Sequence, residues 1–294
     1  MEQPPPSAPA RLAEPIVRTL RAADEATLRY RGLAAVRYLM RTDVHTYAAS
    51  VATYAILAFF PFIVLLMTLT RKVFRSEAMF EVVVQLLRDF LPAGQDFIVR
   101  NLSILVNAQK GVQVFSLVIL LISASGVFLP LEVALNRVWG VKKNRSYLAN
   151  QVVAFGLAFA VGVLAMLSVA LTAGHHALIG TFVSDNTVLQ RALTSVVTKV
   201  FAIVASIGIF FLIYWLLPNA KIPPKKVLPA ALAMGVLWEA AKYIYIAALP
   251  WLDFKDVYGP FALSVTLIFW AFLSGMMLLG GAFISAGNTR VELY

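Results

Sequence analysis

Six separate runs of apolar residues are each long enough, as helices, to cross the roughly 30 Å hydrocarbon core of a bilayer, which needs about 20 helical residues. They cover residues 44–70, 111–131, 149–173, 193–217, 227–250 and 258–286. Only 14% of the chain is charged, against about 25% in a soluble domain. The runs are continuous rather than alternating, which disfavours a membrane β-barrel. The sequence therefore predicts an all-α polytopic protein with six transmembrane helices.

The flanking segments suggest three parts: a tail and basic amphipathic segment over residues 1–43, a transmembrane domain over 44–287, and a short tail over 288–294. Proline is frequent in the first ten residues, and arginines then alternate with apolar residues, as in helices that lie on lipid headgroups. Between the first two spans, residues 72–110 hold two amphipathic segments separated by a proline and a glycine. We predict that they form an outward helical hairpin, too short and polar to span, that caps the bundle.

Basic residues are concentrated in the connections 136–148 and 218–226, whereas the short connections on the opposite side hold few. Short loops rich in Lys and Arg remain in the cytoplasm, so both termini are expected there. The connection 72–110 is also basic, but long loops follow this rule poorly. We interpret the net charge of +10 as attraction to anionic lipid headgroups at the cytoplasmic face, and expect no nucleic-acid partner.

Three blocks of sequence resemble the YihY/BrkB family of bacterial membrane proteins. They are Ala-Ala-Ser-Val-Ala-Thr-Tyr at 48–54 leading to Pro61, Leu-Glu-Val-Ala-Leu-Asn-Arg-Val-Trp-Gly-Val at 131–141 followed by Arg145-Ser146, and a set formed by 217–219, 237–242 and 257–261. One departure is Phe59, where the family commonly has a serine two residues before the proline. The resemblance covers residues 40–287 and implies six transmembrane helices in a bacterial inner membrane.

The resemblance does not supply a biochemical activity. Proteins of this kind have been labelled ribonuclease BN, and others have been linked to virulence or serum resistance. Envelope-lipid transport is an activity that has been suggested for them repeatedly. Possible functions must therefore be judged from the chemistry of the residues themselves.

A metal-dependent nuclease would need clustered His and Asp ligands in water-accessible segments. The chain has three histidines, His45 and the adjacent pair His175 and His176, and adjacent helical residues point about 100° apart. Nucleophilic triads, phosphate-binding loops and dinucleotide glycine motifs are also missing from the sequence. We therefore expect no enzyme activity, no catalytic residue, no metal site and no cofactor, and we disfavour the ribonuclease interpretation.

Polar residues inside the spans are the candidate site, because an ionised side chain at the bilayer centre is unfavourable by about 2.5–3.5 kcal/mol. Glu239 and Lys242 share one face of the fifth span, either as a neutralised structural pair or as a headgroup or proton site. Glu132 and Asn136, followed by Arg137, share a face near the end of the second span. This group forms either a cytoplasmic-interface helix or a polar notch facing a cavity.

Other residues are candidates for shaping the chain rather than for chemistry. Pro61 is expected to kink the first span, and Pro130 to divide the second into a membrane helix and an inner-leaflet helix. Asn219, Tyr258 and Gly259 mark turns at opposite faces of the membrane, with a gating hinge as the alternative.

The leading functional hypothesis is that the protein binds or transfers a lipid or another amphiphilic envelope component, without nucleotide hydrolysis. Arg137, Lys142, Lys143 and Arg145 would form an electrostatic entrance for anionic headgroups from the inner leaflet. The alternative is a membrane scaffold that does not transport and that docks partner proteins. A transporter predicts a continuous polar cavity lined by Glu132, Asn136 and the 239/242 pair, whereas a scaffold predicts that these residues are paired within a tightly packed core.

Overall fold

A computed structural model describes residues 31–90, 99–100, 102, 104, 110–182 and 188–286. All the regular structure in these residues is helical, which confirms the expected all-α fold. The helices are α2 (Arg31–Leu39), α3 (Thr42–Thr68), the π-helical turn η1 (Leu69–Val73), α4 (Glu77–Phe90), α6 (Lys110–Val138), α7 (Tyr147–Phe182), α8 (Val188–Leu216), α9 (Pro224–Leu252), α10 (Phe254–Tyr258), the 3₁₀ turn η2 (Gly259–Phe261) and α11 (Ala262–Ala286).

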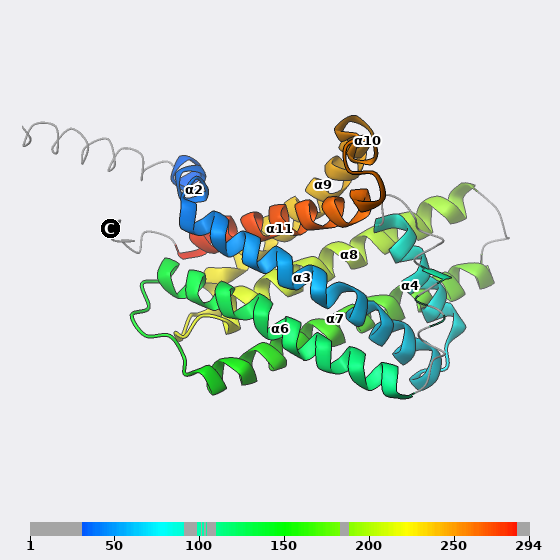
Figure 1. Cartoon of the computed structure of the whole chain (residues 1–294). Helices are drawn as coiled ribbons and strands as arrows, with labels where there is room; N and C mark the ends of the chain where they lie inside the picture. The colour runs from blue at the N-terminus through cyan, green and yellow to red at the C-terminus, as the bar shows by residue number, and fades with distance from the viewer. Residues whose placement is uncertain are drawn as a thin grey trace, which may run out of the picture.

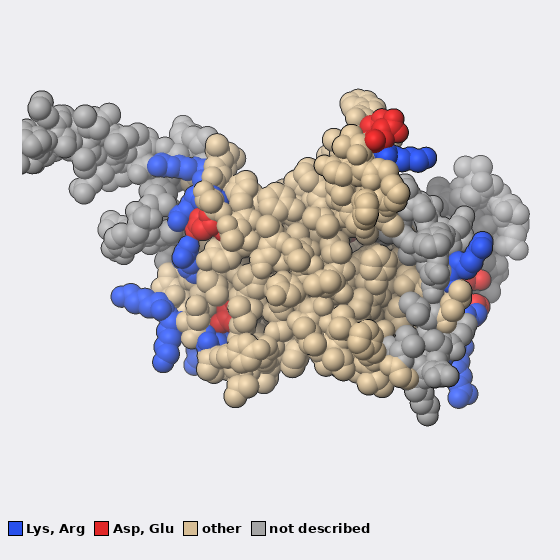
Figure 2. All heavy atoms as spheres, in the orientation of Figure 1, with Lys and Arg blue, Asp and Glu red and all other residues tan. Residues whose placement is uncertain are grey.

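Six helical segments in the described part of the chain are long and apolar enough to cross a membrane, as predicted. They are Thr42–Val73, Val114–Val138, Tyr147–Gly174, Val196–Leu216, Pro224–Leu252 and Phe254–Ala286. On the face shown in Figure 2, charged side chains gather at the two ends of the molecule and leave a band between them that is nearly free of charge. This distribution is what a bundle with its middle in hydrocarbon requires, because charges there are costly.

The six long helices pack into one bundle in which α3 lies along α6, and α11 packs against both α3 and α9 (Figure 1). Helix α8 contacts α7 and α9. We call the end that carries α2 and the α6–α7 and α8–α9 connections the loop end, and the opposite end the α4 end (Figure 1). The buried core has two clusters, one containing Leu135, Tyr214 and Leu279, the other containing Met67 and Val83.

The expected break at Pro130 is wrong, because α6 is continuous from Lys110 to Val138. Proline at this position leaves the carbonyl of Gly126 without its usual i+4 donor. Helix α3 packs along α6 here, and the ring of Tyr54 occupies the space beside Gly126 that a side chain would fill. This packing between α3 and α6 stabilises the helix where the backbone hydrogen bond is missing. Helix α3 likewise continues through Pro61.

The first arm of the predicted hairpin is present as α4. Met79, Val83 and Leu87 are buried on the face predicted to be apolar, and Glu81 and Gln85 are exposed. Helix α4 packs against α3 and α7, so it covers the end of the bundle in the described part of the chain. The second arm falls largely outside the described residues.

The predicted basic segment lies mostly outside the described residues, except for α2. Helix α2 packs against α11, and its Ala34, Ala35 and Tyr38 are all less than 9% exposed. The ring of Tyr38 stacks on that of Phe283, with centroids 4.7 Å apart. Burial, reinforced by the nearby carboxylate of Asp43, raises the pKa of Tyr38 well above its ordinary value. This part of the segment is therefore anchored to the bundle rather than resting only on headgroups.

Candidate functional site

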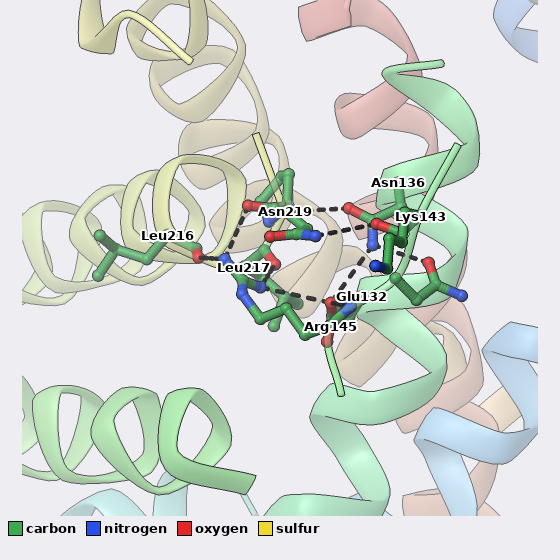
Figure 3. A network of polar contacts seen from close by, with 9 residues as sticks. Glu132, Asn136, Lys143, Arg145, Leu216, Leu217 and Asn219 are labelled. Carbon is green, nitrogen blue, oxygen red and sulfur yellow. Dashed lines mark hydrogen bonds and ion pairs between the residues drawn. The ribbon is translucent and has the colours of Figure 1, made fainter. Parts of the chain in front are cut away.

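A network of polar contacts at the loop end joins four residues of the predicted set, Glu132, Asn136, Arg145 and Asn219, which we call the loop-end network (Figure 3). Glu132 and Asn136 lie one turn apart in α6, and each is 1% exposed. The amide Nδ2 of Asn136 donates to Glu132 Oε1 at 3.3 Å. The same carboxylate oxygen accepts a hydrogen bond from the backbone N–H of Arg145 at 3.3 Å and lies 3.4 Å from its Nη1.

The guanidinium of Arg145 also binds the end of α8. It donates to the carbonyls of Leu216 at 3.2 Å and Pro218 at 3.0 Å, and to that of Leu217 between them (Figure 3). The last carbonyls of a helix have no intrahelical donor and carry the negative end of the helix dipole, so a guanidinium there is stabilising. Arg145 therefore fastens the start of α7 to the end of α8.

Asn219 completes the connection between the two loops. Its backbone N–H donates to Asn136 Oδ1 at 2.6 Å, and its side chain donates to the carbonyl of Lys143 at 2.9 Å. These contacts fix the turn after α8 against the α6–α7 connection. Asn219 therefore occupies a turn, as predicted, and both its backbone and its side chain are hydrogen-bonded.

The loop-end network changes the interpretation of the predicted electrostatic patch. The side chain of Arg145 is 18% exposed and faces Glu132 and the carbonyls of residues 216–218, so it does not belong to an exposed basic entrance. Arg137 is 53% exposed, but its Nη1 lies 2.6 Å from Asp43 Oδ2 of α3. Lys142 and Lys143 are exposed. Of the four residues, Arg145 is turned inward, Arg137 is exposed but paired with Asp43, and the two lysines are exposed.

The charged pair in the fifth span is the second part of the predicted site. Lys242 Nζ donates to Glu239 Oε2, and both residues are 5% exposed, which confirms that they form a buried ion pair. The hydroxyl of Ser206 in α8 donates to Glu239 Oε1 at 2.7 Å. Sequence reasoning did not identify Ser206, because its partner lies 33 residues away on another helix.

Lys242 also lies among aromatic rings. Its Nζ is 5.0 Å from the centroid of Tyr243 and 5.5 Å from that of Trp238. Distances below about 6 Å allow cation–π attraction, which is strongest for Trp. The cation is thus stabilised within the bundle by one carboxylate and by ring faces.

A cavity of about 320 Å³ lies beside this pair, with walls from α3, α9 and α11. It is lined by Ala55, Ile56, Phe59, Trp238, Lys242, Tyr245, Ile246, Leu249, Thr266, Leu267, Trp270 and Ala271. The rings of Tyr245 and Trp270 stack with centroids 5.1 Å apart, and Trp238 continues the aromatic wall at 5.6 Å from Trp270. The space is therefore apolar, with an aromatic wall.

Three further polar side chains of the cavity wall, those of Thr266, Tyr245 and Trp238, bond within the protein. Thr266 Oγ1 donates to the carbonyl of Ala262 at 2.7 Å, and the hydroxyl of Tyr245 donates to the carbonyl of Thr266 at 2.8 Å. The indole N–H of Trp238 donates to Ser274 Oγ at 2.9 Å. Lys242 is the charged residue of the lining.

The candidate residues thus occupy two places rather than one continuous polar cavity. Glu132 and Asn136 lie in the loop-end network, and neither lines the cavity beside Lys242. Glu132 Oε2 is buried without a hydrogen-bond partner in the described part of the chain. Within the same residues, no three His, Asp and Glu side chains gather as metal ligands would. The side chains of His175 and His176 lie outside what the structure describes.

The predicted turn at the α4 end is present. Helix α9 ends at Leu252, the next residue Asp253 has a left-handed φ of +43°, and the short α10 follows. Tyr258 is exposed, and Gly259 has a φ of +51°, which favours glycine because it has no Cβ. The residues at 258–259 therefore set the entry into α11.

Comparisons with known proteins agree with this architecture. A membrane protein of Pseudoalteromonas atlantica of the UPF0761 group is 24% identical over 84% of this chain and 82% of its own length. One from Pseudomonas paraeruginosa is 25% identical over 70% of this chain, which spans about half of that longer relative. A Bacillus subtilis protein named ribonuclease-like YfkH is 24% identical over 81% of this chain and 88% of its own length.

A comparison with solved structures found no match to the chain. The sequence profile of the family described as virulence factor BrkB matches residues 35–292, which include every helix from α3 to α11. The match covers most of the chain and confirms the family resemblance found in the three sequence blocks. The chain therefore belongs to the virulence factor BrkB family of membrane proteins.

Proposed function

We propose that this protein binds a lipid or another amphiphile in the cavity between α3, α9 and α11, and transfers it within the cell envelope without nucleotide hydrolysis. The cavity is the observation that carries the proposal. Its volume, about 320 Å³, lies within the roughly 300–1,000 Å³ range of small-molecule sites. Apolar walls with one convergent charged group are typical of such sites.

The location of the cavity supports an occupant that comes from the membrane. Its walls belong to three membrane-spanning helices, and Ile56, Phe59 and Leu249 are half-buried rather than enclosed. An apolar chain entering from the bilayer would exchange lipid contacts for contacts with Trp and Phe rings. Binding there requires no water-filled pathway.

The experiment is to fill the cavity and measure the lipid that copurifies. Ala271→Phe places a ring in the lining, and Ile268→Phe is the matched control on the exposed face of the same helix. Mass spectrometry of detergent-purified protein should show less tightly bound amphiphile per chain for Ala271→Phe, with Ile268→Phe unchanged. Equal amounts in both variants and in the unmodified protein would contradict the proposal.

The proposed setting is a bacterial inner membrane with both termini in the cytoplasm. The loop end carries Lys142, Lys143, Lys221, Lys225 and Lys226, all exposed. Basic loops remain cytoplasmic and attract anionic lipid at about 1 kcal/mol per residue near the surface. Anionic lipids at this face are the partners we propose, and nucleic acid is not among them.

A second candidate is a scaffold that docks partner proteins and carries no lipid. The loop-end network favours it, because Glu132, Asn136 and Arg145 are paired with one another rather than exposed to a cavity. A scaffold would retain its partners when Ala271→Phe fills the cavity. If that variant lost both its partner proteins and its bound lipid, the result would instead favour amphiphile binding as the primary role.

A further inference from the structure

We infer that the cavity selects a single-chain amphiphile with an acidic head, a carboxylate or a phosphate, and that Lys242 is the residue that binds this head. The inference rests on the proposed function and adds the substrate class and the anchoring group. It follows from the charge that faces the cavity, from the depth of that charge and from the available volume.

The charged residue that lines the cavity is basic. Lys242 lines the cavity, whereas its partner Glu239 does not. The carboxylate of Glu239 accepts hydrogen bonds from Ser206 of α8 and from Lys242, so it is held toward α8, which contributes no residue to the lining. A ligand in the cavity is therefore in contact with Lys242 and not with Glu239.

The aromatic wall would otherwise suit a quaternary ammonium head, because Trp and Tyr faces attract such cations. Here the ammonium of Lys242 lies 5.5 Å from the centroid of Trp238, at the same wall. A second cation at that ring would be repelled by the first, and repulsion between like charges is strong in a medium of low dielectric constant. The wall therefore favours an anion beside Lys242 and disfavours a choline-type head.

The depth of Lys242 restricts the head to a small one. Lys242 lies ten residues before the end of α9 at Leu252, which corresponds to about 15 Å along the helix. That places the ammonium near the middle of a hydrocarbon core about 30 Å thick. The cavity volume of about 320 Å³ is at the small end for ligand sites. One chain with a compact acidic group fits these limits better than a diacyl lipid with a large head.

Binding would be an exchange of ion partners. The acidic head takes the position of Glu239 at Lys242, and Glu239 keeps its hydrogen bond from Ser206. Glu239 then competes with the ligand for Lys242. Removing the charge of Glu239 should therefore strengthen the binding of an acid. Removing the charge of Lys242 should abolish the preference for an acidic head. Opposite effects from two residues of one ion pair would not arise from a purely structural role.

The experiment uses quenching of tryptophan fluorescence by brominated probes. Two of the five tryptophans in the chain, Trp238 and Trp270, line the cavity. The exposed Trp215 and Trp251 are replaced by Phe in the whole chain, to reduce quenching by probe molecules that are dissolved in the detergent around the protein. The probes are a brominated fatty acid, the alkyl phosphate with the same chain, and the uncharged alcohol.

In the Trp-reduced protein, we expect the acid and the alkyl phosphate to bind about tenfold tighter than the alcohol, as for a charge-assisted hydrogen bond. The tighter of the two identifies the head that the site prefers. Glu239→Gln should tighten acid binding severalfold. Glu239→Gln combined with Lys242→Met, which leaves no buried charge unpaired, should equalise the three probes while retaining alcohol binding.

Lys199→Met is the matched control, because Lys199 is an exposed lysine of α8 that also lies near Tyr243 but does not line the cavity. It should leave the preference for the acid unchanged. Equal binding of all three probes to the protein with Lys242 and Glu239 intact would overturn the acidic-head inference and leave amphiphile binding standing. Failure of every probe to quench the cavity tryptophans, in all variants, would overturn both.

Discussion

The side chains of Glu132 and Arg145 form an ion pair, with Arg145 Nη1 3.4 Å from Glu132 Oε1, and the carboxylate is 1% exposed. Removing one partner of a buried pair leaves an uncompensated charge, which destabilises by about 3–5 kcal/mol. Arg145→Met should destabilise the protein more than Glu132→Gln does, because Arg145 also donates to three carbonyls at and just beyond the end of α8.

Thermal unfolding in detergent would measure this effect. The control is Arg137→Met, since the pair of Arg137 and Asp43 is more exposed and should contribute less than about 1 kcal/mol. If Arg137→Met and Arg145→Met lowered the thermal stability equally, the loop-end network would have no special importance for stability.

The ion pair in α9 yields a second prediction, on stability rather than binding. Glu239→Ala and Lys242→Ala should each destabilise the protein, because each leaves a buried charge without its partner. The double change to Leu and Met should recover much of the loss. Strictly additive effects in a double-mutant cycle would contradict a direct interaction between the two residues.

Gly281 of α11 provides a prediction about packing. A Cβ at this position would overlap the hydroxyl of Tyr214, which donates to the carbonyl of Leu278, and would also overlap Met234. Gly281→Ala should therefore destabilise by about 1–3 kcal/mol through overpacking.

Gly156 of α7 is the matched control, because a Cβ there meets nothing within 4 Å. Gly156→Ala should be neutral or stabilise by up to about 1 kcal/mol, since alanine is the better helix former. If both substitutions changed the melting temperature equally, close packing at Gly281 would not explain its effect.

The orientation in the membrane is the fourth prediction. The chain has no cysteine, so single cysteines can report accessibility without background. Cysteines replacing Lys143 or Lys225, both exposed at the loop end, should react in intact cells only with membrane-permeant thiol reagents. Cysteines replacing Glu77 or Lys255 at the α4 end should react with impermeant reagents. The reverse labelling pattern would show that the orientation is opposite to the predicted one.

The fold could be predicted from the sequence because each span is a continuous apolar run. A single segment that crosses the hydrocarbon core must pair its own backbone N–H and C=O groups, and a helix does this. The contact between Glu239 and Lys242 could also be predicted, because residues three apart share a helix face. The cavity could not, because its walls come from α3, α9 and α11, and only the tertiary arrangement shows that these residues meet.

The contacts of Arg145 were missed for a different reason. Its acceptors at residues 216–218 are backbone carbonyls, which every residue has, so no residue type identifies them. The sequence showed a basic residue in a short loop that the charge distribution predicts to be cytoplasmic, and the general rule assigned it to the lipid surface. The continuity of α6 through Pro130 was missed similarly, because the support from α3 depends on packing between helices.

The contacts of Arg145 also constrain the order in which the protein assembles during its synthesis. Its carbonyl acceptors follow it by 71, 72 and 73 residues. A ribosome moving from the N-terminus exposes Arg145 well before it synthesises those acceptors. While α7 and α8 are being inserted, the nascent chain must hold this arginine and the carboxylate of Glu132 without their final neighbours. The α6–α7 connection can reach its final shape only after the fourth span has entered the membrane, so this closure is a late event in assembly.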